Sequence, residues 1–339
     1  MDNFFLNRNP LVKDYLQKTF PKSQFNAKIC LIGDSGFIGK WIVFVSEMLN
    51  SLGTVSIQLT GVSRSDIPKS KESTSYRHLL VKDVQGLDLN NFTHIIWGAS
   101  STSRELNYSD SNALFDQLLN KVLTQEFKGF LLNLSSGAVY KNAFTPSGAL
   151  PEDSPIFDLK QENISEYAKS KIYIERRVLD IASKIDLGFL NARLFSFCGP
   201  GMPKSEGYAM NDFFSKTVSN QDITLNGNPE TIRAFMHPFD LTVKIIELII
   251  ETPPVECLNV GSDDPQTIKF FVDEISKLGN SKVLLGSKAQ DESLKNYFPD
   301  TTKLRHYTNS ANFFSTSTML IDTFKFYQSQ ISENMESGR

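Results

Sequence analysis

The segment "LIGDSGFIGK" at residues 31–40 carries the clearest indication of the fold. Glycine recurs in it at every third position, as Gly33, Gly36 and Gly39. Glycine permits positive φ and lets another atom come close to the main chain. Apolar residues precede the triplet as in a buried strand, and a helical pattern follows it. The glycines therefore lie on a strand-to-helix turn, where their spacing suggests a ligand pressed against the backbone.

The same alternation of patterns continues along the first 140 residues. Short apolar runs predict strands at 27–33, 54–65, 78–84, 93–101 and 128–140, and helical periodicity predicts helices at 37–53 and 109–125. Strands that alternate with helices indicate an α/β fold with a doubly wound parallel sheet, whose ligands bind beyond the carboxyl ends of the strands.

Composition excludes several classes of function. The 339 residues are 40% hydrophobic, which is enough for a large core, and a formal net charge of −3 gives no basic footprint for nucleic acid. Cys30, Cys198 and Cys257 are widely separated, so we expect free thiols and no metal site. The N-terminus has no secretory signal and no apolar run is long enough for a membrane span, so we expect a soluble, cytoplasmic protein.

The glycine turn has the chemistry of a phosphate site. A helix N-terminus offers unpaired N–H groups and a partial positive charge, which suit a pyrophosphate. The alternative is that the glycines only permit tight packing of helix on strand. We expect the turn to bind a dinucleotide through Gly33, Ser35, Gly36, Phe37, Ile38 and Gly39.

The end of the second predicted strand indicates which dinucleotide. An acidic side chain there would bind a ribose 2′-hydroxyl, but the sequence has "GVSRS", with Ser63 and Arg64. A guanidinium can bind a 2′-phosphate in a fork, whereas a carboxylate would repel it. We therefore expect NADP, with NAD as the alternative. A solvated surface arginine would explain Arg64 equally well.

Two further motifs carry acid-base chemistry. "EYAKSKIYIERRV" places Tyr167 and Lys171 four residues apart on a predicted helix, hence on one face. A lysine ammonium beside a phenol favours phenolate and lowers a pKa that is ordinarily about 10. "NLSSGAVY" ends the fifth strand with Ser135 and Ser136, whose hydroxyls can bond a substrate oxygen. Taken singly, each motif is also explained by an exposed helix face or a strand-end cap.

In this order the motifs resemble those of the extended short-chain dehydrogenase/reductase family, in its branch of nucleotide-sugar epimerases, dehydratases and reductases. The resemblance covers roughly residues 28–265 and rests on "GDSGFIG", "KDV", "GASS", "SSGAVY", "YAKSK", "NARLFSFCGPG", "IRAFMHPFD" and "LNVGS". It implies an N-terminal extension at 1–27 and a Rossmann-like NAD(P)-binding domain at 28–194. Residues 195–335 would mainly form a smaller substrate-binding domain, with some segments returning to the first.

The resemblance also assigns site residues. Ser136, Tyr167 and Lys171 match the family's catalytic serine, tyrosine and lysine, the last two also contacting the cofactor, and Asn112 falls where a helix asparagine often holds water or backbone near the site. Further cofactor contacts would be Asp83, Val84, Gly98, Ala99 and Ser100.

Substrate contacts follow from the same resemblance. Ser101, Ser136 and Ser196 would contact the sugar nucleotide. Arg233 matches an arginine that pairs with the nucleotide diphosphate, the alternative being a structural ion pair. His237 and Asp240 match a buried supporting element.

Some positions depart from the family pattern. Dehydratases follow the catalytic serine or threonine with acidic residues, whereas this chain has Gly137 and Ala138. Ser196 replaces an asparagine that often binds the nucleotide sugar, and Pro238 in "FMHPFD" alters the pattern between the family's aromatic and proline landmarks.

Three functions remain open. The first is hydride transfer on a nucleotide-linked sugar, by net reduction or by epimerisation. The second is 4,6-dehydration, and the third is a silent dinucleotide sensor or scaffold. The resemblance further implies a homodimer, for which Leu114, Leu118 and Val122 would supply apolar contacts unless they face the sheet.

Overall fold

The computed structural model describes residues 9–21, 25–65, 67–80, 86–99, 108–144, 146, 148–161, 164–203, 209–286, 289 and 293–336. The cofactor positions Asp83, Val84 and Ser100 and the substrate position Ser101 lie outside the described residues.

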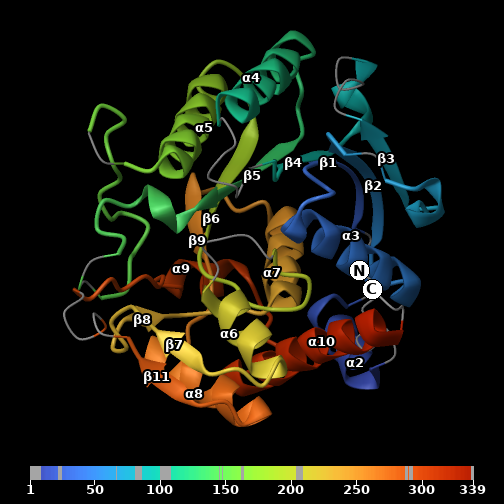
Figure 1. The fold of residues 1–339 in the computed structure, drawn as a ribbon. Helices are drawn as coiled ribbons and strands as arrows, with labels where there is room; N and C mark the ends of the chain where they lie inside the picture. The colour runs from blue at the N-terminus through green and yellow to red at the C-terminus, as the bar shows by residue number, and fades with distance from the viewer. Residues whose placement is uncertain are drawn as a thin grey trace.

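A parallel sheet of seven strands forms the centre of the molecule (Figure 1). Its order is β3-β2-β1-β4-β5-β6-β9, and every neighbouring pair runs parallel. The strands are β1 (Asn26–Ile32), β2 (Ser56–Ser63), β3 (Tyr76–Leu80), β4 (His94–Trp97), β5 (Phe130–Ser136), β6 (Gly188–Leu194) and β9 (Cys257–Val260). The predicted doubly wound α/β fold is therefore confirmed.

Helices cover both faces of this sheet. α3 (Phe37–Leu52) and α7 (Pro238–Glu251) pack on one face, and α4 (Tyr108–Thr124) and α5 (Glu166–Ala182) on the other (Figure 1). α3 ends at Gly53, which takes the left-handed conformation with φ 64° that favours glycine. At the N-terminus, α2 (Pro10–Thr19) buries Val12 and Leu16 in the cluster that α3 and α7 share.

The apolar residues of α4 that were suggested for a dimer contact are covered by other parts of the same chain. Leu118 and Val122 of α4 are completely buried among side chains of the sheet, and Leu114 is partly buried against the same cluster. The apolar stripe of α4 therefore faces the sheet, and the expectation that Leu118 and Val122 form a subunit contact is wrong. A homodimer itself stays a prediction.

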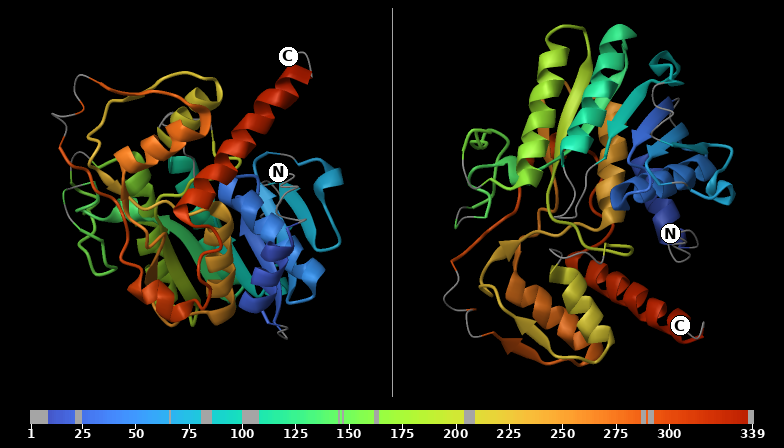
Figure 2. Two further views of the ribbon diagram at one scale, coloured as in Figure 1. Left: turned by 90° about the horizontal axis from the view of Figure 1, so that it is seen from below. Right: turned by 45° about the horizontal axis from the view of Figure 1, so that its top comes forward.

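Most of the chain after β6 builds a second group of elements, which lies at one end of the sheet (Figure 2). α6 (Ala209–Val218), α8 (Ile268–Gly279) and α10 (Thr316–Glu336) enclose an apolar cluster that includes Phe214, Phe271 and Met319. The remaining elements are β7 (Ile223–Leu225), β8 (Ile232–Arg233), β10 (Gln266–Thr267), β11 (Val283–Leu285), α9 (Thr302–Tyr307) and the short 3-10 helices η1 (Lys69–Lys71), η3 (Leu89–Asn91) and η4 (Gly137–Val139). None of the helices in the described ranges has the length and apolar character needed to cross a membrane.

Candidate active site

The three glycines of the turn have different roles. Gly33 has φ +102°, and a Cβ there would lie 2.7 Å from the carbonyl carbon of Gly98. A Cβ on Gly39 would lie 2.2 Å from the carbonyl oxygen of Gly33. Packing alone therefore requires glycine at these two positions, as the alternative interpretation of the sequence proposed.

Gly36 is the exception. It is exposed, and among the described residues an ideal Cβ would meet only the Gly33 carbonyl oxygen, at 3.1 Å. Gly36 is also the N-cap of α3, and no side chain caps the helix there. The first N–H groups of α3 therefore keep the open geometry that suits an anion, and Gly36 lets that anion approach. Phe37 and Ile38 are half-buried, Phe37 being stacked on Phe197 at 5.5 Å.

Asp34, between the first two glycines, ties the turn to the sheet. Its Oδ2 accepts a hydrogen bond of 2.7 Å from the Tyr76 hydroxyl and lies 2.7 Å from Nδ1 of His78. Gly61 in β2 makes room for this carboxylate, because a Cβ there would lie 1.9 Å from Oδ2. Oδ1 of Asp34 and Nε2 of His78 are buried without a partner among the described residues. The glycine turn is thus attached to β2 and β3 by a buried polar cluster.

The ends of β2 and β4 border the turn. Ser63 is buried and donates its hydroxyl hydrogen to the Ser65 carbonyl at 3.0 Å, whereas Arg64 is exposed and has no carboxylate partner in the described ranges. Gly98 follows β4 and donates its N–H to the Ile32 carbonyl at 2.8 Å. Ala99 is adjacent, its nitrogen 2.8 Å from the position of a Cβ on Gly33.

Tyr167 and Lys171 lie on the first turns of α5, as predicted. Ser165 caps this helix by accepting a hydrogen bond of 3.2 Å from the Ala168 N–H. Lys171 Nζ is 5.7 Å from the centre of the Tyr167 ring and donates to the Leu134 carbonyl at 2.7 Å. Burial lowers the pKa of Lys171 to about 8, against the opposing effect of the nearby Glu175 carboxylate.

The two serines at the end of β5 point to different partners because successive side chains alternate across a strand. Ser135 donates to Glu175, which forms a buried ion pair of 2.8 Å with Arg193. The Ser136 hydroxyl accepts the Ala138 N–H at 3.2 Å and caps η4. Ser136 is therefore the serine left for the site, two residues beyond the carbonyl that Lys171 contacts.

Asn112 reaches the same helix. Its Oδ1 accepts a hydrogen bond of 2.6 Å from the Ser170 hydroxyl, which lies between Tyr167 and Lys171 in sequence. In this structure Asn112 thus joins α4 to α5.

Arg233 faces the site from the second group of elements. Its guanidinium lies 5.6 Å from the Phe144 ring and 5.9 Å from the Tyr297 ring, and it donates to the carbonyls of Ile232 and Lys295. Burial lowers the pKa of Arg233 to about 10. No carboxylate of the described residues pairs with it, which counts against a structural ion pair and leaves a half-buried guanidinium able to bind an anion.

Three other residues named in the sequence analysis take part in hydrogen bonds with main-chain N–H groups. Ser196 is half-buried, and its carbonyl accepts the Met236 N–H at 3.1 Å. His237 caps α7 by accepting the Phe239 N–H at 3.1 Å, and Asp240 accepts the Phe313 N–H at 2.7 Å. Burial raises the pKa of Asp240 to about 7, and burial lowers that of His237.

A sequence profile decides the family. The profile of the NAD-dependent epimerase/dehydratase family matches residues 29–261, which contain the glycine turn, Ser136, Tyr167, Lys171 and Arg233. The chain belongs to the NAD-dependent epimerase/dehydratase family. The resemblance to extended short-chain dehydrogenases/reductases is thereby confirmed.

Solved structures share the fold of this family member. UDP-glucuronic acid 4-epimerase from Bacillus cereus, solved in complex with NAD, has a TM-score of 0.72 at 15% identity, covering 89% of this chain and 99% of that one. UDP-N-acetylglucosamine 4-epimerase from Bacillus cereus has a TM-score of 0.70 at 18% identity, covering 89% of this chain and 100% of that one. UDP-glucose 4-epimerase from Thermus thermophilus, solved in complex with NAD, has a TM-score of 0.70 at 16% identity, covering 89% of this chain and 99% of that one. At the level of sequence, no curated protein matches the chain.

Two residues of the site were missed by sequence reasoning. The sequence contains one indirect signal for Asp34, because a glycine inside a strand, here Gly61, often marks a place where another group approaches the backbone closely. Tyr297 gave none. It is buried beside Arg233, whose guanidinium lies 5.9 Å from its ring, and its hydroxyl lies 3.5 Å from the Leu194 carbonyl.

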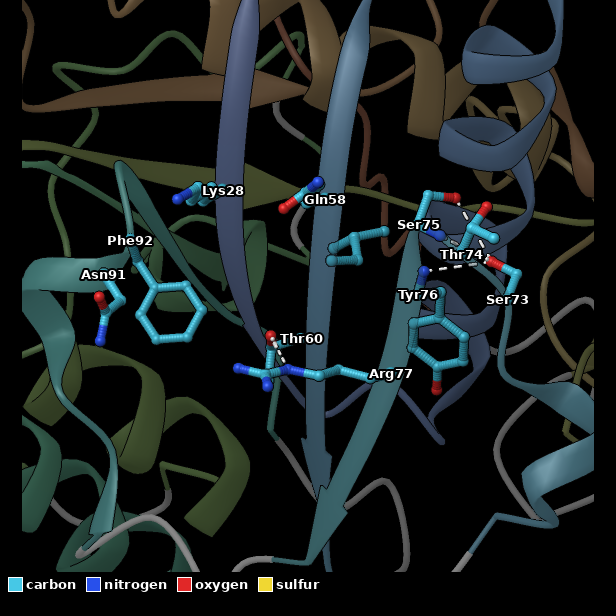
Figure 3. Close-up of a pocket in the computed structure, with 11 residues that line it drawn as sticks. Lys28, Gln58, Thr60, Ser73, Thr74, Ser75, Tyr76, Arg77, Asn91 and Phe92 are labelled. Carbon is cyan, nitrogen blue, oxygen red and sulfur yellow. Dashed lines mark hydrogen bonds between the residues drawn. The ribbon is translucent and has the colours of Figure 1, made fainter.

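A depression of about 380 Å³ on the epimerase/dehydratase-family chain lies away from these groups (Figure 3). Lys28, Gln58, Thr60, Arg77 and Phe92 line it, on strands β1 to β3 and beside η3. Arg77 donates to the Thr60 hydroxyl at 2.9 Å, as Figure 3 shows. None of the predicted site residues that the structure describes borders this depression.

Proposed function

We propose that the chain is an NAD(P)-dependent enzyme that oxidises or reduces a carbinol carbon of a nucleotide-linked sugar. The observation that carries this proposal is that Lys171, 5.7 Å from the centre of the Tyr167 ring, donates to the Leu134 carbonyl, two residues before Ser136 at the carboxyl end of β5. The glycine turn of the same sheet edge has the open helix N-terminus that a dinucleotide pyrophosphate fits.

The residues divide the chemistry among them. A bound nicotinamide dinucleotide supplies hydride acceptance and donation. Tyr167 exchanges a proton with the sugar hydroxyl, and Ser136 hydrogen-bonds the same oxygen as it passes between alcohol and carbonyl. The Lys171 ammonium, buried against the Tyr167 ring, favours the phenolate form that accepts this proton.

NADP is the proposed cofactor, with NAD as the alternative. β2 ends in Ser63 and Arg64 without a carboxylate, and the exposed guanidinium of Arg64 suits a 2′-phosphate. The carboxylate of Asp34 on the neighbouring turn is directed to Tyr76 and His78 instead. The UDP-glucuronic acid 4-epimerase from Bacillus cereus and the UDP-glucose 4-epimerase from Thermus thermophilus were solved with NAD, so a preference for NADP would distinguish the chain from them.

The substrate class rests on Arg233. A half-buried guanidinium without a carboxylate partner in the described ranges suits the diphosphate of a sugar nucleotide, because its planar donors meet phosphate oxygens in pairs. The relatives named above act on UDP-linked sugars. We propose the same class here.

Dehydration is the less favoured reaction. A Cβ at Gly137 would lie 2.6 Å from the Phe195 ring, which is itself buried and stacked on Tyr297. In this chain the Phe195 ring therefore leaves no room for an acidic side chain at position 137. Tyr167, Lys171 and Ser136 also argue against a silent sensor, which needs no proton chemistry.

Replacing Tyr167 by phenylalanine tests the proposal. The substitution removes the hydroxyl and keeps the ring, so turnover should fall by roughly 10² to 10⁴ with cofactor affinity little changed. UDP-, dTDP-, GDP- and CDP-linked sugars and their 4-keto forms would be assayed with NADPH and NADP. A variant that turns over its substrate at the wild-type rate would show that the proton comes from another group.

A further inference from the structure

One face of α5 carries three polar side chains spaced four residues apart. They are Tyr167, Lys171 and Glu175, and side chains at this spacing are neighbours on a helix. Lys171 is 3% exposed and Glu175 is 4% exposed, so both charges are buried. Burying a carboxylate is costly unless it is paired and hydrogen-bonded, so the partners of Glu175 indicate what it does.

The same face of α5 is bonded to the two residues of β5 that come directly before Ser136. Lys171 Nζ donates to the Leu134 carbonyl at 2.7 Å. Glu175 Oε1 accepts the Ser135 hydroxyl hydrogen at 2.5 Å. Two hydrogen bonds, one turn of helix apart, therefore join α5 to the end of this strand.

Arg193 of β6 holds the Glu175 carboxylate in a fixed direction. It pairs in register with Ser135 across β5 and β6, which brings its guanidinium beside that serine. Its Nε donates to Glu175 Oε1 at 3.1 Å and its Nη2 to Oε2 at 2.8 Å. Its Nη1 donates to the Tyr140 hydroxyl at 3.0 Å and to the Glu152 carbonyl at 3.1 Å. Every guanidinium nitrogen is thus engaged, and neither partner of the fork can turn away.

A pair of this kind is not the most stable way to fill the space. Apolar residues of similar volume often stabilise a protein as much as a buried ion pair does, because both charges must lose their water. What the pair adds is direction, since a fork of two hydrogen bonds with a third from Ser135 defines the angle of the carboxylate. The Glu175–Arg193 pair therefore contributes geometry more than stability.

Glu175 also acts on Lys171 through its charge. Burial lowers the pKa of Lys171 to about 8, and the Glu175 carboxylate opposes this effect. On α4, Asp116 is bonded to Tyr173 and Arg177 instead. The other titratable side chains around the pair are Tyr167, Tyr140, Glu152, Arg193, Cys257 and Tyr297.

We propose that Glu175, paired with Arg193, is a positioning residue that holds α5 against the end of β5 and so sets the place of Tyr167 and Lys171 relative to Ser136. Ser135 provides the link on the side of the strand, and the rigid helix provides it on the other. The negative charge of Glu175 also favours the ammonium form of Lys171. The catalytic consequence rests on the function proposed above.

A double-mutant cycle in stability tests the link without any substrate. Ser135→Ala removes the hydroxyl, and Glu175→Gln removes the charge that accepts its hydrogen. The decreases in urea midpoint should be less than additive in the double variant. Ser276→Ala is the matched control, because this buried serine of α8 also donates, to the Asp273 carbonyl, but lies in another cluster. Its decrease should add fully to that of Glu175→Gln. Additive decreases for Ser135 and Glu175 would overturn the link.

The pH dependence of the urea midpoint tests the charge. In the wild type, the folded Lys171 loses its proton at about pH 8 and the unfolded one at about 10.4, so stability rises between these values. In Glu175→Gln the folded lysine should lose its proton sooner, and the rise should begin at a lower pH. Ser135→Ala should keep the wild-type profile, and Lys171→Met should lack the rise. A wild-type profile in Glu175→Gln would overturn the effect of its charge on Lys171.

Kinetics test the positioning role itself. On a nucleotide sugar that the wild type turns over, Ser135→Ala should lower kcat about tenfold and change KM and cofactor affinity little, because small displacements of reacting groups slow the chemical step. Glu175→Gln should lower kcat and also move the alkaline fall of kcat to lower pH. Ser276→Ala should leave kcat unchanged.

The possible outcomes separate the two proposals. Ser135→Ala needs no buried charge to be left unpaired, so it reports on positioning even if Glu175→Gln does not fold. A wild-type kcat in Ser135→Ala would overturn the positioning role and leave the proposed function standing. A wild type inactive on every nucleotide sugar would instead overturn the proposed function and the catalytic consequence together, while the urea cycle still decides the link.

Discussion

Replacing Gly36 by serine should separate the stability of the glycine turn from its binding of cofactor. Gly36 has φ −70° and ψ 171°, a backbone conformation that any residue adopts, and it is the N-cap of α3. Serine is a preferred N-cap residue and is better than glycine there by a few tenths of a kcal/mol, about what the 3.1 Å contact with Gly33 would cost. The free energy of unfolding should therefore change by less than about 0.5 kcal/mol.

Cofactor binding should respond strongly to the same change. The new Cβ and hydroxyl would stand where a pyrophosphate approaches the first N–H groups of α3, and the hydroxyl would itself cap one of them. Overpacking of this kind costs about 1 to 3 kcal/mol, which corresponds to roughly 5- to 150-fold weaker binding. Calorimetric titration with NADP and with NAD measures the affinity, and thermal melting measures the stability.

Gly39→Ala is the contrasting variant. Its Cβ would lie 2.2 Å from the Gly33 carbonyl oxygen, so the helix preference for alanine, about 1 kcal/mol, should be outweighed by strain of about 1 to 3 kcal/mol or more. We expect Gly39→Ala to melt early and Gly36→Ser to melt normally. Wild-type cofactor affinity in a normally folded Gly36→Ser protein would refute the placement of the pyrophosphate.

Three further predictions concern single residues of the site. Arg64→Ala should weaken NADPH binding by about 1.5 to 3 kcal/mol and leave NADH nearly unaffected, and equal losses in titrations of both would contradict a role in reading the 2′-phosphate. Gly61→Ala should lower the free energy of unfolding by about 1 to 3 kcal/mol, because its Cβ would lie 1.9 Å from the Asp34 carboxylate, whereas Gly227→Ala, with nothing within 4 Å, should have little effect in the same urea titration. Lys171 has a folded pKa of about 8, below the unfolded value of about 10.4, so the folded chain binds fewer protons between these pH values and its stability should rise there with pH. Lys171→Met should lose that rise in urea midpoints measured from pH 7.5 to 9.5, while kcat/KM of the wild type should fall above about pH 8 as the ammonium is lost.

Much of the fold could be predicted because its signals are local. Short apolar runs gave the first five strands of the sheet, and the glycines at 36 and 53 mark where α3 begins and ends. The error on α4 has a physical cause. Periodicity shows that Leu118 and Val122 share a face, but the same stripe could be covered by a sheet or by a second subunit. Only the packed structure decides between them.

The residues of the candidate site likewise divide into those that a local pattern predicts and those that only the packed structure brings together. Tyr167 and Lys171 are four residues apart on one helix, and Ser136 ends a strand beside them, so a short pattern predicts each of them. The stack of Tyr297 on Phe195 joins the segment after β11 to the residue that follows β6, and no local pattern encodes it.

The side chains that local patterns miss constrain the chemistry as much as those they find. Gly137 looks in the sequence like a missing acid, yet the Phe195 ring already fills the space of any side chain there. That ring is held by its stack on Tyr297. This aromatic stack therefore leaves no room for an acidic side chain directly after Ser136. Its presence favours reversible hydride and proton exchange at a carbinol carbon over elimination of water.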